Sequence, residues 1–343
     1  MQHRRFIYLA LVLLAAALLY WRSPQEPSSA MATLSGKAMG TTYSISLPAQ
    51  HADETLADTI EQRLEELENI FSTWRDDSEI SRFNASRNSD WFSCSAELAK
   101  VVAASIETHT LTGGAFEVTL GPLIERWGFD AAEVTTPPSE EELSALMQSV
   151  GTAHLETRES PPAIRKRLPD TVINLSGIAK GYAVDVIAEL LEQRGLALYM
   201  VEIGGEVRTK GRHDDRPWRI AIAKPRPGEP RAQRIIEVDS ASIATSGGYQ
   251  NTLELLNQRY IHILDPATGK PVKSRTASVT VIDEESTMRA DAFATAFMVM
   301  PADDALRLAD RYEIAAYFIV LGEEDQLVQR ASKTFHLRLE PVQ

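Results

Sequence analysis

The sequence predicts a protein of the α+β class with substantial antiparallel strand pairing. Apolar residues recur at helical spacing in several long segments, and short strand-like segments separated by turns dominate the chain after residue 198. The composition, 44% hydrophobic and 24% charged, is that of an ordinary globular protein. Neither an internal repeat nor a low-complexity tract is present, so a mixed body of helices and sheets is the expected architecture.

Individual elements follow from local periodicity and from helix start and stop signals. The clearest helix covers 53–71, where apolar residues recur every three or four positions. Ser139 and Glu142 stand at capping-box spacing, which predicts a helix that begins there and stops at Gly151. In chain order we expect a strand over 41–47, helices over 53–71, 95–111 and 139–150, a strand over 172–175, a helix over 180–194, strands over 199–203, 218–223, 235–238, 260–264 and 277–282, helices from 290 and from 302, and a strand over 314–321.

Charge and cysteine content exclude several classes of function. The chain carries 48 acidic and 35 basic side chains, a formal charge of −13, so a nucleic-acid partner or a polybasic lipid-binding surface is not expected. The single cysteine, Cys94, excludes an internal disulfide, a cysteine zinc site and a CxxC redox motif.

Residues 1–32 are expected to form a signal-anchor or signal peptide with a short linker, ahead of a body over 33–343. A basic flank, His3 to Arg5, precedes the uncharged run from Phe6 to Trp21. This run is shorter than the roughly 20 apolar residues that a typical membrane span requires. The flank favours an exported body on the periplasmic side of the inner membrane, or in the periplasm if the segment is cleaved near Ala30 to Ala32. A buried N-terminal helix is the alternative.

The segment over 172–185 predicts an anion-binding turn. A strand leads through a glycine-containing turn into a helix, and main-chain N–H groups at such a helix start hold phosphate. Lys180 lies in the first helical turn, where a cation opposes the helix dipole by ~0.3–1 kcal/mol. Local conflicts of this kind are often functional. A solvated lysine on a tight turn is the alternative interpretation.

The segment over 289–300 predicts a metal site. Between Ala290 and Met300, only Asp291 and Thr295 carry polar side-chain atoms, and their spacing of four places both on one helix face. A carboxylate and a hydroxyl suit Mg²⁺, which takes one or two protein oxygens and leaves its other positions to water and phosphate. The alternative is structural, with Asp291 as a helix N-cap and Thr295 bonded back to a main-chain carbonyl.

The segment over 260–272 is predicted to be a strand followed by a turn. His262 could act as a general base or as a phosphate contact, although a lone histidine on a strand is more often structural. Asp265 and Thr268 are expected to form the turn.

Together with six further segments, these three resemble the ApbE family, the FAD:protein FMN transferases. The resemblance extends from Met39 to Met300. Its other segments are Met39–Thr42, Phe71–Asn84, Gly114–Leu123, Trp127–Phe129, Val201–Val207 and Ala244–Asn251.

The resemblance implies a T-fold-like α+β enzyme that is exported and often attached to the membrane. It implies Mg²⁺ and FAD, the latter as substrate, with FMN coupled through a phosphoester to a Thr or Ser of an acceptor protein and with AMP released. The acceptor would be a membrane redox-complex subunit.

The family's functional residues are carried over to matching positions of this chain. The resemblance implies that the metal ligands are Asp291, Thr295 and the main-chain oxygen of Gly177. The catalytic candidates are His262 and Asp291. The residues expected to contact FAD are Met39, Trp74, Ala115, Phe116, Glu117, Asn174, Lys180, Ser246 with Gly247, and His262. Trp74 or Phe116 would stack on a flavin or adenine ring.

Two positions depart from the family pattern. Glu117 stands where the family shows Asp, which keeps the charge and lengthens the reach. Asn174 also replaces Asp, which removes a charge and adds donor hydrogens. Besides the transferase, two alternatives stay open. One is an FAD pyrophosphatase of the same fold that uses water as the nucleophile, and the other is a non-catalytic flavin-binding envelope protein.

Overall fold

The structure is a computed structural model that describes residues 30–129, 134–226, 231–248, 252–255 and 258–339. The expected export segment, with its apolar run over 6–21, lies outside these residues. Within the described ranges, no helix combines the length and the apolar character that a membrane crossing requires. The first described strand starts at Met31, two positions before residue 33, where we place the start of the body.

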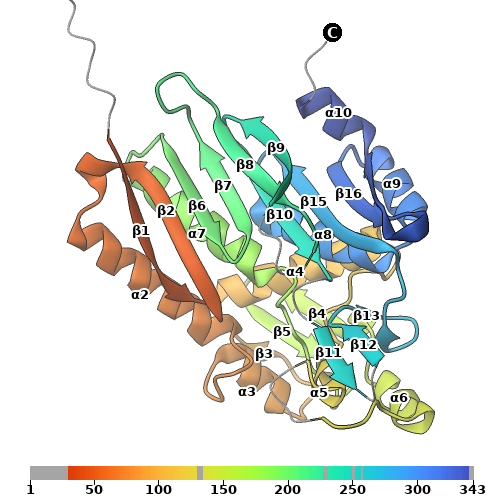
Figure 1. The fold of residues 1–343 in the computed structure, drawn as a ribbon. Coiled ribbons are helices and arrows are strands. Elements are labelled where there is room, and N and C mark those ends of the chain that lie inside the picture. Colours follow the sequence, from red (N-terminus) through yellow and green to blue (C-terminus); the bar gives the residue numbers. More distant parts are fainter. Residues whose placement is uncertain (1–29, 130–133, 227–230, 249–251, 256–257, 340–343) are drawn as a thin grey trace, which may run out of the picture.

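An eight-stranded sheet organises the fold (Figure 1). Each pair of neighbouring strands is antiparallel, in the order β1-β2-β6-β7-β10-β15-β16-β17, so segments from both ends of the described chain share one sheet. The strands are β1 (Met31–Ala38), β2 (Thr41–Pro48), β6 (Tyr199–Ile203), β7 (Glu206–Lys210), β10 (Ala241–Gly247), β15 (Thr276–Asp283), β16 (Ala315–Leu321) and β17 (Leu327–Ala331).

The sheet separates two apolar layers. On β10, Ile243 packs with Val207 and Tyr317 on one face, whereas its neighbour Ala244 packs with Phe293 on the other. Successive side chains of a strand point to opposite faces, so strands that are apolar at neighbouring positions need cover on both sides. Antiparallel sheets often leave one face to solvent, but this one is covered twice.

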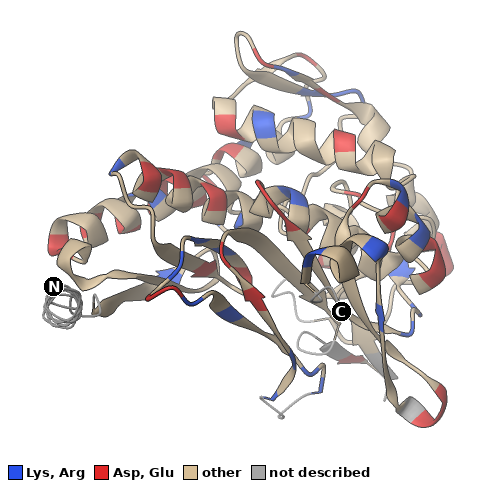
Figure 2. Cartoon of the chain, turned by 90° about the horizontal axis from the view of Figure 1, so that it is seen from above, with Lys and Arg blue, Asp and Glu red and all other residues tan. Residues whose placement is uncertain are grey.

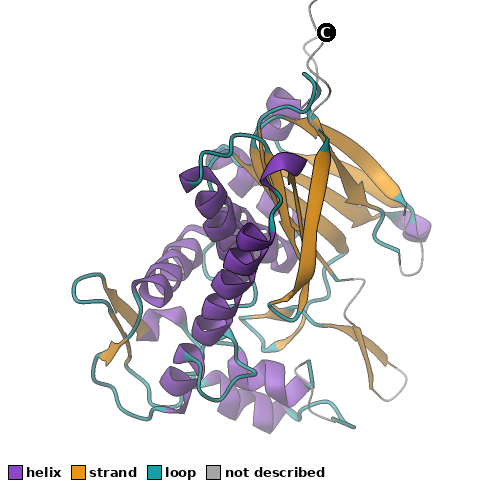
Figure 3. Cartoon of the chain, turned by 90° about the vertical axis from the view of Figure 1, so that its left-hand side faces the viewer, coloured by secondary structure: helices purple, strands orange, loops and turns teal. Residues whose placement is uncertain are grey.

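Most helices lie on one face of this sheet, as the side view shows (Figure 3). Helix α7 packs against β6 and β7, α8 packs against β10 and β15, and the two helices contact each other. This layer contains α2 (Glu54–Phe71), α7 (Ala179–Gln193), α8 (Thr287–Val299) and α9 (Ala302–Arg311). The α7–α8 pair contains most of the two segments, 172–185 and 289–300, that predict the anion-binding turn and the metal site.

The opposite face is covered by a hairpin and by the last helix. Ile222, Ile236 and Phe335 from these elements join the apolar layer around Tyr317. The elements are β8 (Trp218–Ala223), β9 (Ala232–Val238) and α10 (Lys333–Leu339).

The remaining elements form a smaller lobe beside one end of the sheet (Figure 1). It contains one three-stranded sheet, β3-β5-β4, and two separate strand pairs. Its elements are α3 (Glu79–Ala85), α4 (Ala96–Leu111), α5 (Gly121–Trp127), α6 (Glu140–Met147), β3 (Phe92–Ser93), β4 (Leu155–Arg158), β5 (Ala163–Lys166), β11 (Thr252–Leu255), β12 (Gln258–Ile261), β13 (Leu264–Asp265) and β14 (Lys270–Pro271). Short 3-10 helices lie at η1 (Ala49–His51), η2 (Thr152–His154) and η3 (Glu323–Asp325).

Charged residues are distributed over the outer helices and loops, with both signs interspersed (Figure 2). Arg75, for example, bridges Glu65 and Glu68 at the surface of α2. Exposed ion pairs of this kind contribute ~0–1 kcal/mol each. The two apolar layers therefore hold the fold together.

The expected helices are confirmed, including the capping box between Ser139 and Glu142, although α6 ends at Met147, before the expected stop at Gly151. Helix α8 begins at Thr287, three residues before the expected start, because Ser286 caps it by accepting the N–H of Arg289. Local sequence patterns do not predict several elements that are short or lack a clear period. These are α3, α5, α10 and the strands β1, β3, β4, β5, β7, β10, β11, β14 and β17.

The expected strand over 172–175 is wrong, because these residues have no sheet partner. Instead, the side chain of Asn84 binds the main chain of Ile173 in both directions, with Nδ2 donating to its oxygen at 2.8 Å and Oδ1 accepting its N–H at 2.9 Å. The N–H of Asn174 donates to the oxygen of Val118 at 2.7 Å. A buried apolar loop held by a side-chain amide has the same residue pattern as a short strand.

The expected strand over 260–264 is interrupted. β12 ends at Ile261 and β13 begins at Leu264, so His262 lies in the bend between them. The turn after β13 is confirmed, since Asp265 accepts hydrogen bonds from the Ala267 N–H and the Thr268 hydroxyl, both at 2.9 Å.

Candidate active site

One cleft of about 730 Å³ brings together most of the predicted site residues. Its walls come from the start of α7, one face of α8, the end of β10, the loop before α5 and the bend after β12. The predicted residues that line it are Ala115, Phe116, Glu117, Asn174, Gly177, Lys180, Ser246, His262, Asp291 and Thr295. Gly247 lines it as well, whereas residues 249–251 of the same segment lie outside the described residues.

Met39 and Trp74 line a neighbouring pocket of about 140 Å³. This pocket shares Asn174 and Lys180 with the cleft, so the two cavities adjoin. Met39 has a φ of 54° in the turn between β1 and β2, and its N–H donates to Glu68 Oε1 at 2.7 Å. Trp74 is 67% exposed, whereas Phe116 is 2% exposed. Of the two rings, Trp74 is therefore the one accessible for stacking.

Helix α8 presents Asp291 and Thr295 on the cleft side, one turn apart, as predicted. The capping alternative does not hold, because Ser286 is the N-cap and Asp291 lies inside the helix. Asp291 is 2% exposed and accepts the N–H of Gly181 at 3.0 Å. Burial raises the pKa of the Asp291 carboxyl, and the nearby cation of Lys180 partly opposes this increase.

Glycines allow α8 to approach the start of α7 closely. A Cβ at Gly181 would lie 2.4 Å from the Thr287 main-chain oxygen, and one at Gly177 would lie 3.0 Å from Thr295 Cγ2. Gly181 therefore has to stay without a side chain for α7 and α8 to meet, and Gly177 leaves little room beside Thr295. This requirement does not follow from helix propensity, which disfavours Gly181 inside a helix.

The oxygens of Thr295 and Gly177 converge beside Asp291. Thr295 Oγ1 lies 3.4 Å from the Gly177 main-chain oxygen and 3.4 Å from Ser246 Oγ. The described residues contain no cluster of three or more His, Cys, Asp or Glu side chains suited to a metal. A divalent ion here would therefore rely on one carboxylate with neutral oxygens, the ligand set that Mg²⁺ accepts. The predicted ligands fit such an ion.

The structure adds a carboxylate, Glu206, that the sequence analysis does not single out. Lys180 Nζ lies 2.8 Å from Glu206 Oε2, and the Glu206 side chain is 3% exposed. Burial, and then the nearby Asp291, raise the pKa of Glu206 to about 8, while Lys180 opposes that shift. The cation that opposes the dipole of α7 thus lies beside two buried carboxyl groups, Glu206 and Asp291.

A signal for Glu206 exists in the sequence, although it is indirect. Gly204 and Gly205 have φ values of 63° and 102° and form the tight turn between β6 and β7, which predicts that Glu206 opens a strand. A Cβ at Gly204 would lie 3.2 Å from Lys180 Cδ, so the glycine also leaves room for the lysine. The contact with Lys180 itself depends on packing.

Glu206 should make the stability of the ligand-free protein depend on pH. Its folded pKa lies above the ~4.3 of an unfolded glutamate, so the folded state binds more protons between the two values. The free energy of unfolding should therefore fall as pH rises from about 5 to about 8. We expect Glu206→Gln to flatten this decline, measured by thermal unfolding. Glu202→Gln, on the same hairpin but less buried, should leave the wild-type slope, and equal slopes in all three proteins would contradict the prediction.

Glu117 lines the cleft, but its carboxylate is occupied by the protein itself. Oε1 accepts from the hydroxyls of Thr119 and Thr152, both at 2.6 Å, and Oε2 accepts the Thr152 N–H at 3.0 Å. Oε2 also lies 3.3 Å from His109 Nδ1. This arrangement indicates that Glu117 holds the loop before α5 in place. The longer side chain at this position thus joins two loops of the smaller lobe.

Asn174 also forms part of a local structure. Its Oδ1 accepts the N–H of Ser176 at 3.0 Å, which closes an Asx turn ahead of Gly177. An aspartate could accept the same bond, so the change to Asn keeps the turn while removing a negative charge from the cleft.

Asp185 on α7 positions α8, a role that the sequence analysis does not assign. Its carboxylate accepts the N–H groups of Thr287 and Met288 at 2.8 and 3.0 Å and the Ser286 hydroxyl at 3.1 Å. It also pairs with Arg208 at 2.9 Å. A carboxylate is well placed at a helix N-terminus, where the dipole is positive. Asp185 thereby sets the position of α8 relative to α7.

Fold and site together define an α+β enzyme whose buried cleft, with its oxygens and its lysine, suits a phosphate-containing substrate. The chain belongs to the ApbE family, whose model matches residues 39–318. This agrees with the resemblance found in the sequence.

Relatives and solved structures extend the similarity over most of the chain. An FAD:protein FMN transferase of Vibrio cholerae serotype O1 is 42% identical over 325 residues, which is 93% of this chain and 96% of the relative. The transferase of Escherichia coli is 34% identical over 90% of this chain and 91% of its own length. The solved flavin transferase ApbE of Vibrio cholerae matches with a TM-score of 0.82, covering 90% of this chain and 99% of that one. The apo flavinyl transferase ApbE of Pseudomonas stutzeri matches at 0.80 with 36% identity, covering 90% and 96%.

Proposed function

We propose that this chain is an FAD:protein FMN transferase that couples FMN to a Thr or Ser hydroxyl of an acceptor protein. The observation that carries the proposal is the convergence of Asp291, Thr295 and the Gly177 oxygen beside Lys180 in one cleft. The transferase names of relatives that match nearly the full chain support it.

Mg²⁺, held by Asp291, Thr295 and the Gly177 oxygen, would neutralise charge on the substrate pyrophosphate. Lys180 would contact the same phosphates, and its ion pair with Glu206 directs its ammonium group into the cleft. Trp74 at the adjoining pocket would stack on a ring of FAD. The protein's contribution is mainly positioning and charge neutralisation, as is usual for phosphoryl transfer.

In the proposed reaction, the acceptor oxygen forms a bond to the phosphorus of the FMN half of FAD. The bond between that phosphorus and the bridging oxygen breaks, and AMP leaves with both bonding electrons. The acceptor proton passes to a base, for which His262 in the cleft is the candidate.

We further propose that the body acts on the periplasmic side of the inner membrane. The basic flank followed by the apolar run over 6–21 supports an anchor there, or a periplasmic location if the segment is cleaved. An acceptor that is a subunit of a membrane redox complex would then share the same compartment.

The experiment is incubation with FAD and Mg²⁺, with and without a candidate acceptor protein. Covalent flavin fluorescence on the denatured acceptor, together with stoichiometric AMP, supports transfer. AMP release that does not depend on an acceptor would indicate the pyrophosphatase, and absence of both products would indicate a flavin-binding protein without catalysis.

His262→Ala should lower the transfer rate more than it weakens FAD binding, because removal of a general base typically costs roughly 10²–10⁴-fold in rate. The measurement is the single-turnover rate at saturating FAD, with FAD affinity measured separately. We expect the acidic limb of the pH–rate profile to flatten. An unchanged rate with weakened affinity would assign His262 to FAD binding instead.

A further inference from the structure

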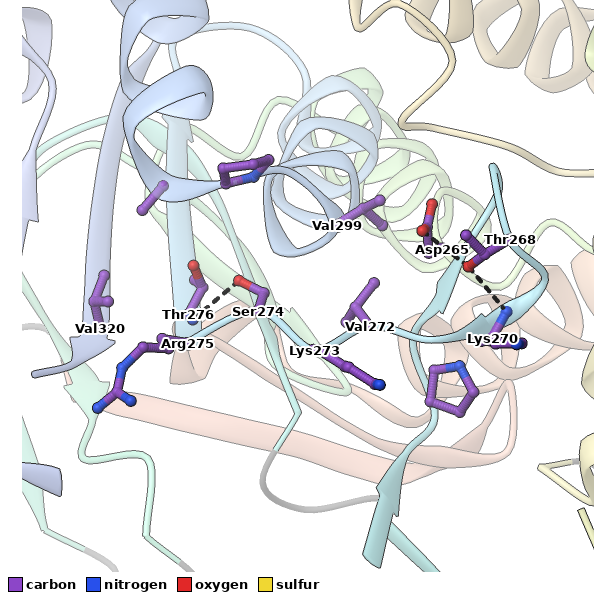
Figure 4. Close-up of a pocket in the computed structure, with 13 residues that line it drawn as sticks. Asp265, Thr268, Lys270, Val272, Lys273, Ser274, Arg275, Thr276, Val299 and Val320 are labelled. Atoms are coloured by element: carbon purple, nitrogen blue, oxygen red, sulfur yellow. Dashed lines mark hydrogen bonds between the residues drawn. The ribbon is translucent and has the colours of Figure 1, made fainter.

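A second cavity of about 590 Å³ adjoins the cleft at the far end of α8 (Figure 4). Val299 lines both cavities, and Leu264 of the cleft is followed by Asp265 of this one. Val299 is four residues beyond Thr295 and eight beyond Asp291, so these three residues lie on one helix face. At 1.5 Å per residue, the new cavity begins about 6 Å along the axis from Thr295 and about 12 Å from Asp291.

This cavity, here called the α8 groove, has an apolar floor and a basic rim. Val272, Val299 and Val320 form the floor, and Figure 4 shows Lys273 extending along the rim beside Val272. Lys270 and Arg275 also line it, so the rim carries three cations.

The described residues that line the groove carry little negative charge. Asp265 is the one carboxylate among the lining residues, and its oxygens already accept the Ala267 N–H and the Thr268 hydroxyl. Lys270 pairs with Glu140, which is 83% exposed, and Arg275 donates to the main-chain oxygens of Leu321 and Gly322. Lys273 is exposed and makes no ion pair with a described residue. In a chain with a formal charge of −13, this is a locally basic surface.

We propose that the α8 groove binds the acceptor protein through an extended acidic segment next to the accepting Thr or Ser. This inference rests on the proposed transferase function and names the surface that the acceptor uses. An extended chain advances about 3.3 Å per residue, so a separation of 6–12 Å corresponds to roughly two to four residues. Asp or Glu side chains at that distance from the hydroxyl meet the basic rim, and small apolar side chains cover the valine floor.

The test uses fluorescent peptides, each with a single Thr among Ala and Gly and two charged residues roughly three positions away. One peptide carries Asp, a second Asn and a third Lys. Binding to the full chain with FAD and Mg²⁺ is measured by anisotropy. We expect the Asp peptide to bind the wild type more tightly than the Asn peptide, and the Lys peptide to bind most weakly, with the differences shrinking at high salt.

Lys273→Glu should lower the affinity for the Asp peptide roughly threefold to tenfold and raise the affinity for the Lys peptide. The affinity for FAD should stay unchanged. Lys333→Glu is the matched control, because Lys333 is 84% exposed at the start of α10 and does not line either cavity. Ala302→Trp is a second variant, which fills the groove from the start of α9 without touching the cleft. It should weaken binding of all three peptides.

Failure of this inference can be distinguished from failure of the proposed function. A wild type that transfers FMN to an acceptor protein, but whose affinity for the Asp peptide is insensitive to Lys273→Glu and Ala302→Trp, would overturn the groove and leave the transferase intact. Equal affinity of the wild type for the three peptides would also overturn it. Absence of FMN on any acceptor would count against the transferase.

Discussion

Asp291→Ala is expected to lower FMN transfer by more than about a hundredfold, because outer-shell partners of metal ligands alone cost 10–100-fold when removed. Asp291 is the carboxylate of the proposed ligand set, and the Thr295 and Gly177 oxygens are neutral. The measurement is the initial transfer rate across a Mg²⁺ titration. The variant should need far more Mg²⁺ for any residual activity.

Two further variants separate the metal role from a structural one. Asp291→Asn retains an oxygen that can accept the Gly181 N–H but removes the charge, so it should keep the fold and lose most activity. Thr295→Ala should be milder, at about tenfold, since water can replace a neutral hydroxyl. Near-normal turnover of Asp291→Asn at sub-millimolar Mg²⁺ would remove the metal role from this residue.

Gly181→Ala is expected to reduce both stability and activity, against the usual trend. Replacing glycine inside a helix by alanine normally stabilises by ~1 kcal/mol. Here the new Cβ would lie 2.4 Å from the Thr287 oxygen and 2.8 Å from Asp291 Cβ, so α7 and α8 must separate. Overpacking of this kind costs typically ~1–3 kcal/mol. After the helix gain is subtracted, we expect a net loss of about 1 kcal/mol in the free energy of unfolding.

The same separation moves Asp291 away from Gly177 and Lys180, and a displacement of about 1 Å can cost roughly a hundredfold in rate. Chemical denaturation and transfer rates together measure both effects. Glu189→Ala, at an exposed position of the same helix, is the control and should be neutral in both assays. A Gly181→Ala protein as stable and as active as the wild type would show that the two helices are not held at the distance seen here.

Much of the fold is predictable from local sequence. The apolar spacing of α2, the capping box of α6 and the alternation of β8 depend on neighbouring residues, and each is found where the sequence places it. The local pattern did not predict the structure of residues 172–175. This apolar segment forms hydrogen bonds with the Asn84 side-chain amide instead of pairing with a neighbouring strand. The local pattern was also insufficient at His262, where the strand breaks into a bend.

The sequence by itself determined that Asp291 and Thr295 share a helix face and that Lys180 starts a helix after a glycine-containing turn, because these relations depend only on helical periodicity and turn chemistry. Only the tertiary structure decided that Glu206 meets Lys180 and that Asp185 accepts main-chain N–H groups at the start of α8. It also decided that the carboxylate of Glu117 is used up by two threonines. Apart from the bond between Glu117 and Thr119, these contacts join residues far apart in the chain, across elements whose approach is set by glycines and apolar packing. The local pattern of residues along the chain does not determine how closely such elements approach each other.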